Sequence, residues 1–109
     1  MPFEMANLQA RVTGVDAYIH VYQDVSMRSK HGPRVKVFPG KPHEGNPTTI
    51  AVPTHPIQRA EVIGKVTIKS QVLKGALEFV DLNWRFLATY WWNPGYGTDQ
   101  LLEDLQAVE

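Results

Sequence analysis

The sequence predicts an α+β domain in which one long helix packs on an antiparallel sheet of three or four strands and a short helix follows. Two observations support this fold class. Apolar and polar residues alternate along the first half of the chain, which is typical of half-buried strands. Near residue 67 the period changes, and apolar residues then recur every three or four positions, as in amphipathic helices. At 109 residues the chain has the commonest size of one domain, so we expect residues 1–109 to form a single domain.

The strands are expected between residues 15 and 66. Four short segments have strand-like composition or alternation: 15–24, 34–38, 48–52 and 60–66. All but one of the eight prolines precede residue 57, in or beside the turns that separate these segments. Short strands punctuated by turns predict an antiparallel meander, with one side of the sheet polar.

A long helix is predicted over residues 70–92, where two largely apolar stripes run side by side. The segment forms either one helix of about 34 Å or two helices with a bend near Asn83. The turn sequence Asn-Pro-Gly-Tyr-Gly at 93–97 ends it. A terminal helix is predicted over residues 98–107, with Thr98 as its N-cap.

Aromatic residues are concentrated at the end of the long helix, at Tyr90, Trp91 and Trp92. One apolar stripe is enough to cover a small sheet, so these rings either close the core, receive the terminal helix or form an interface. Aromatic side chains at helical spacing are usually buried, which favours core closure. Interface cores are also rich in aromatic residues, so the three are candidate interface residues as well.

Charge and composition limit the classes of function. The chain carries 11 basic and 11 acidic residues, so no net charge draws it to nucleic acid. Basic residues cluster between positions 28 and 41, whereas the last eleven residues carry only acidic charges. This asymmetry indicates a basic binding face, or two ends that pair within the molecule or across a dimer. The absence of cysteine excludes disulfides and thiolate chemistry. No apolar run approaches the ~18 residues of a membrane span, so we expect a cytoplasmic protein without a membrane partner.

The basic segment and the first predicted strand define a candidate binding face. If the two strands share a sheet, six side chains point away from the core: Tyr18, His20, Tyr22, Arg34, Lys36 and Phe38. Rings interleaved with cations on an open sheet are used to bind single-stranded RNA. The same residues also suit a protein partner, or the merely polar outer side of a sheet, since tyrosine and phenylalanine favour strands.

Metal binding and catalysis are two further interpretations of the same region. His31, His43 and His55 recur every twelve residues, but no two histidines have the close spacing typical of metal ligands. We therefore predict no metal site and no cofactor. His31 or His43 with Arg34 and Lys36 would supply the residue types for metal-independent RNA cleavage. Any basic surface strand supplies them too, so no catalytic residue is assigned.

The order of these segments resembles domain-of-unknown-function family 4160, a group of small bacterial proteins. The likeness covers roughly residues 15–92 and rests on the aromatic first strand, "GPRVKVF" at 32–38 and the helix end "NWRFLATYWW" at 83–92. Arg34 and Lys36 stand where members of the family carry histidines, so the role of those histidines is not carried over. The resemblance implies one half of a toxin–antitoxin-type pair and supplies no mechanism.

Together these observations predict a non-enzymatic module that binds a protein partner or a second copy of itself. Zero net charge favours a protein partner, because non-specific nucleic-acid binding depends on attraction to phosphates. The alternative is single-stranded RNA binding, or metal-independent ribonuclease activity, on the basic and aromatic face.

Overall fold

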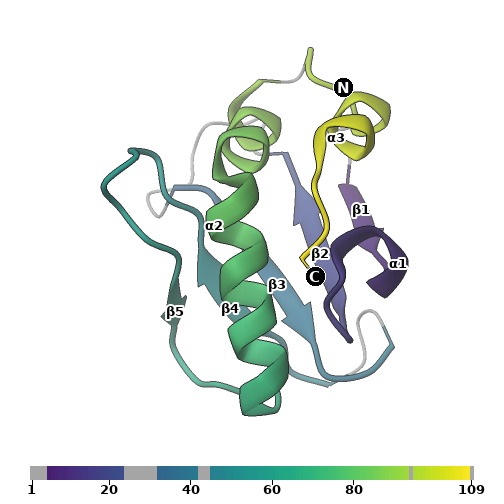
Figure 1. The fold of residues 1–109 in the computed structure, drawn as a ribbon, viewed down its shortest axis with the longest axis vertical. Coiled ribbons are helices and arrows are strands. Elements are labelled where there is room, and N and C mark those ends of the chain that lie inside the picture. Colours follow the sequence, from purple (N-terminus) through teal and green to yellow (C-terminus); the bar gives the residue numbers. More distant parts are fainter. Residues whose placement is uncertain (1–4, 24–31, 42–44, 94, 109) are drawn as a thin grey trace.

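A computed structural model describes residues 5–23, 32–41, 45–93 and 95–108. It confirms the α+β class: an antiparallel sheet lies behind a long helix, and the shorter helices lie on the same side of the sheet (Figure 1). The strands follow one another across the sheet in chain order, β1-β2-β3-β4-β5, so the sheet is the expected meander.

The sheet has five strands, one more than the upper limit of the prediction. They are β1 (Met5–Leu8), β2 (Tyr18–Tyr22), β3 (Arg34–Phe38), β4 (Thr48–Ala51) and β5 (Glu61–Ile63). The strand that the sequence analysis did not predict is β1, which precedes the expected strand region. Its four residues are too few to show an alternating pattern, and they form a strand by pairing antiparallel to β2.

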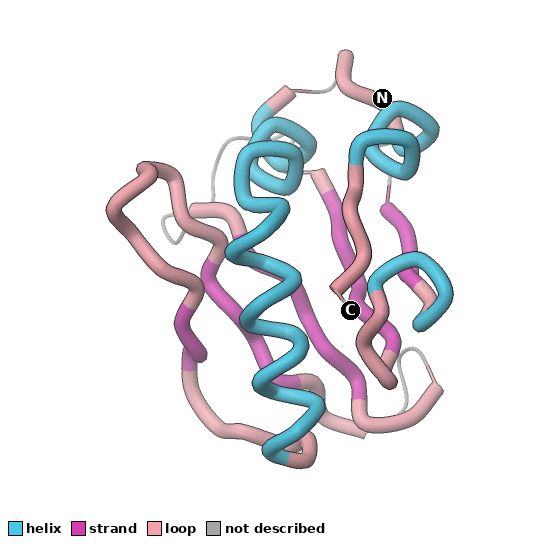
Figure 2. Tube along the Cα trace, in the orientation of Figure 1, coloured by secondary structure: helices cyan, strands magenta, loops and turns pink. Residues whose placement is uncertain are grey.

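Three helices complete the fold: α1 (Ala10–Thr13), α2 (Ser70–Trp92) and α3 (Thr98–Asp104). The bounds of α2 are those predicted, and Figure 2 shows it crossing the sheet as one continuous element. A bend is nevertheless present where expected, because Asn83 has non-helical dihedral angles (φ −115°, ψ 15°). The terminal helix is shorter than predicted, since the chain becomes extended at Leu105 (φ −64°, ψ 140°).

The core lies between α2 and the inner face of the sheet. Alternate residues of β2 and β3 are buried there, which confirms the predicted inward side of both strands. The main contributors from sheet and helix are Ile19, Val21, Val35, Val37, Ile50, Ala76, Phe79, Val80 and Leu87. Because these residues face the core, the alternate residues of β2 and β3 lie on the opposite, outer side of the sheet.

The segment after α3 is held beside the bend of α2. The amide of Asn83, fully buried, donates to the carbonyl oxygens of Phe79 (2.9 Å) and Gln106 (2.8 Å) and accepts from the backbone N–H of Gln106 (2.8 Å). Further along, the N–H of Val108 donates to the carbonyl of Thr13 (2.8 Å). The bend therefore supplies a docking point for the C-terminal residues.

A membrane-spanning helix is not found in the part of the chain that the structure describes, since no helix there is both long and apolar enough.

Candidate functional site

The outer faces of β2 and β3 bring the six predicted face residues together. Antiparallel pairing sets Tyr18 opposite Phe38 and His20 opposite Lys36. One step further along the strands, the Nε of Arg34 donates a hydrogen bond to the hydroxyl of Tyr22 at 3.1 Å. The candidate face is therefore one continuous surface, as the sequence pattern predicts.

This face is less open than expected. His20 is only 7% exposed and Phe38 only 4%, and the other four side chains are half-buried. The His20 ring lies 5.6 Å from that of Tyr22 and 6.4 Å, edge-on, from that of Phe38. Rings that are packed in this way are not available as a platform on which bases stack.

The two cations of the face lie against aromatic rings. The guanidinium carbon of Arg34 is 5.6 Å from the centroid of Trp91, and the Nζ of Lys36 is 5.9 Å from that of Tyr22. At these distances a cation is attracted by the ring quadrupole. Both charges thus contribute to the packing of the face itself.

His20 is positioned from β1. Its Nδ1 lies 2.9 Å from the Oδ1 of Asn7, the residue paired with it across the strands. This hydrogen bond joins β1 to the candidate face. Asn7 was not identified from the sequence, because its strand was not predicted. One signal in the sequence points to Asn7: it is the single polar residue in the otherwise apolar segment "MANL".

The three aromatic residues at the end of α2 occupy different environments. Tyr90 is 1% exposed and its hydroxyl is 2.9 Å from the Oγ1 of Thr98; Trp91 is 2% exposed. Both belong to the buried part of the molecule, whereas Trp92 is 41% exposed. Of the three candidate interface residues, only Trp92 offers a ring to a partner.

The exposed ring of Trp92 packs against a cluster of less exposed side chains. Its ring meets that of Trp91 edge-on, with centroids 6.4 Å apart and planes at 85°. Trp91 in turn packs on Tyr22 at 4.9 Å and beneath Arg34. We call these four residues the Trp92 corner. It joins the end of α2 to the edge of the predicted sheet face.

The turn beside the Trp92 corner is fixed by polar contacts. The side-chain amide of Gln23, directly after β2, donates to the carbonyls of Asn93 (3.3 Å) and Tyr96 (3.0 Å). The Tyr96 hydroxyl donates to a carboxylate oxygen of Asp104 at 2.6 Å. Burial, together with this hydrogen bond and the nearby negative charge, raises the pKa of Tyr96 well above its ordinary value. The chain reversal between α2 and α3 is thereby held against the sheet.

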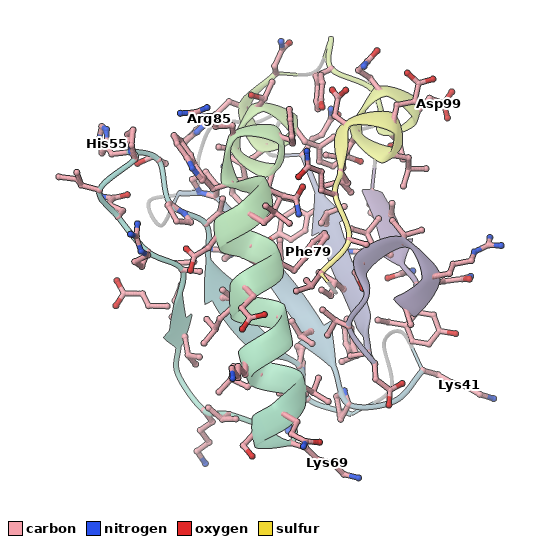
Figure 3. All side chains as sticks on the ribbon, viewed as in Figure 1. Lys41, His55, Lys69, Phe79, Arg85 and Asp99 are labelled. Carbon is pink, nitrogen blue, oxygen red and sulfur yellow. The ribbon has the colours of Figure 1, made fainter. Side chains whose placement is uncertain are left out.

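Of the three histidines that recur every twelve residues, only His55 lies within the described part of the chain. His31 and His43 lie outside the described residues, and Figure 3 shows His55 at the edge of the molecule, on the loop between β4 and β5. In the described ranges, no three His, Cys, Asp or Glu side chains are grouped as metal ligands would be.

Comparisons with protein-family models, with curated proteins and with solved structures find no match to this chain. The resemblance to family 4160 therefore rests on its motifs alone.

Proposed function

We propose that this protein is a non-enzymatic interaction module that binds a protein partner, in the simplest case a second copy of itself, through the Trp92 corner. The proposal rests on one observation: the indole of Trp92 is exposed, and it packs against Trp91, which is buried and in contact with Tyr22 and Arg34. Tryptophan is enriched among the few residues that dominate binding energy at protein interfaces. A ring already held by its neighbours also loses little conformational freedom on binding.

The packing of the sheet face favours a protein partner over single-stranded RNA. Stacking requires ring faces that a base can cover, and His20 and Phe38 are buried. Attraction to phosphate is greatest for cations that are free in solvent, whereas Arg34 and Lys36 are half-buried and lie against rings. If the resemblance to family 4160 holds, the partner is the product of a neighbouring gene in a toxin–antitoxin-type pair.

Self-association tests the proposal directly. We expect the mass from light scattering to rise between two concentrations about a hundredfold apart, and Trp92→Ala to weaken the association about tenfold or more. Leu82→Ala is the matched control, because Leu82 is another exposed apolar residue of α2 that does not belong to the Trp92 corner. We expect that variant to associate like the unmodified protein.

Titration with a uridine oligonucleotide at low salt tests the alternative, which is binding of single-stranded RNA. The proposal predicts little affinity. It is contradicted by a protein that stays monomeric at both concentrations and binds the RNA with steep salt dependence. In that case Arg34→Ala with Lys36→Ala should lower the salt slope by about two.

A further inference from the structure

Three adjoining clefts lie at the end of the molecule where α2 begins. The first, about 480 Å³, lies between α1 and the loop after β3; the second, about 260 Å³, and the third, about 320 Å³, continue toward the first turns of α2. All three are lined by Asp16, and each shares further residues with the next. The three clefts therefore adjoin one another around Asp16, and we call them together the Asp16 groove.

The middle of the groove is apolar and its ends are cationic. Ala17, Pro39, Ile68 and Val72 line the central cleft. Arg11 and Lys41 line the first cleft, and Lys69 lines the second and third. In Figure 3 the labelled side chains of Lys41 and Lys69 lie at the same end of the molecule, and both point toward solvent.

The charges of the groove are not used inside the described part of the protein. Arg11, Lys41 and Lys69 make no side-chain hydrogen bond or ion pair with the residues described, and neither does the carboxylate of Asp16. Three cations and one acid leave an excess of positive charge. The groove is thus complementary to an anionic ligand.

The walls of the groove are held in place before any ligand binds. The N–H of Thr67 donates to the Oγ1 of Thr48 (2.7 Å), which ties the segment before α2 to β4. On the other side, the Oγ1 of Thr13 accepts from the N–H of Val15 at 3.0 Å. A preformed groove lowers the ordering cost of binding.

We propose that the Asp16 groove binds an extended acidic peptide segment, with acidic side chains at its two ends and apolar residues between them. The terminal carboxylates meet Arg11 and Lys41 on one side and Lys69 on the other. The apolar residues lie over the central floor. The carboxylate of Asp16 accepts backbone N–H groups of the peptide.

Asp16 and the composition of the lining favour a peptide over nucleic acid. A phosphodiester backbone carries a negative charge at every residue and no N–H donor, so a carboxylate in the middle of the groove repels it. Tyr18 is the one aromatic residue in the three linings, so bases find no succession of rings on which to stack. A peptide supplies donors for Asp16 and places its charges only where the cations are.

This groove is separate from the Trp92 corner. Lys69 directly precedes α2 and Trp92 ends it, so these two residues lie about 34 Å apart along the helix, and none of the residues that line the groove belongs to the Trp92 corner. The inference goes beyond the proposed function, and each can fail without the other.

Fluorescence anisotropy with a labelled peptide of eight residues tests the proposal. The peptide has two glutamates at each end and four aliphatic residues between them. We expect binding at low salt that Lys41→Gln with Lys69→Gln weakens about tenfold, through the loss of two charge-assisted contacts. The control is Lys65→Gln with Lys74→Gln, which removes the same charge from exposed lysines that do not line the groove. That pair should change the affinity less than about twofold.

Two further arms separate a peptide site from a general attraction for anions. We expect Asp16→Ala to weaken peptide binding, because an acceptor is lost, and a uridine octanucleotide to bind less tightly than the peptide. Tighter peptide binding by Asp16→Ala, tighter binding of the octanucleotide, equal losses in the two lysine pairs, or no binding of the peptide would each overturn the proposal. Trp92→Ala should bind the peptide normally. If it does and still associates weakly with itself, the two surfaces are independent.

Discussion

Asn83→Ala is expected to lower the free energy of unfolding by about 3 kcal/mol, because it removes three hydrogen bonds and leaves their backbone partners unpaired. The Asn83 side chain is fully buried and is the polar link between the bend of α2 and Gln106. Without it the segment after α3 loses its hydrogen bonds to α2 and keeps the one from Val108 to Thr13. Urea unfolding followed by circular dichroism measures the effect.

Thr89→Ala is the matched control for this prediction. Thr89 lies on the same helix and its hydroxyl also bonds to a helix carbonyl, that of Arg85 at 2.7 Å, but it is exposed. Its removal should cost about 0.5 kcal/mol or less. Equal losses in the two variants would show that Asn83 does not anchor the C-terminal segment. Hydrogen exchange at the N–H of Gln106 provides an independent measurement, since it should become fast in Asn83→Ala only.

Gly14→Ala is expected to cost about 3 kcal/mol from two sources. Gly14 has a φ of +78°, a conformation that costs a residue with a side chain about 1–2 kcal/mol. A Cβ at this position would also overlap the carbonyl oxygen of Val108. The C-terminal segment must then move away, which breaks the hydrogen bond from Val108 to Thr13. Thermal unfolding should show a midpoint lower by roughly 10 °C or more for a domain of this size.

Gly64→Ala separates the two sources. Gly64 has a similar φ of +83°, but a Cβ there would meet no atom within 4 Å. This variant should lose only the conformational part, about 1–2 kcal/mol. If both glycine variants lose the same amount, the close approach of the C-terminal segment to Gly14 does not contribute to stability.

The period of the sequence predicts the elements that bury a continuous apolar side. Residues 70–92 were identified as a helix because their two stripes are long and regular, and β3 because its valines alternate with larger polar or aromatic side chains. The pairing of β1 and the docking of the C-terminal segment were not predictable in this way. Both depend on contacts between parts of the chain far apart in sequence: β1 with β2, and Gln106 with Asn83.

The sequence predicts which side chains share the outer side of β2 and β3, but it does not predict how far those side chains are buried. Strand alternation places Tyr18, His20 and Tyr22 on one side whatever covers them. The contact of Arg34 with Trp91 depends on where the end of α2 meets the sheet, and no local pattern reports that. The Asp16 groove was missed for the same reason, since its cations come from three separate elements.

The indole N–H resonances of the three tryptophans provide the most direct test of the proposed partner-binding role. Trp92 is exposed, whereas Trp84 lies beneath Arg85 in another part of α2, with the guanidinium carbon 5.2 Å from its ring, and serves as an internal reference. As protein concentration rises and the mass in solution increases, we predict that the Trp92 resonance shifts and the Trp84 resonance does not. A Trp92 resonance that stays fixed while the protein associates would contradict the account.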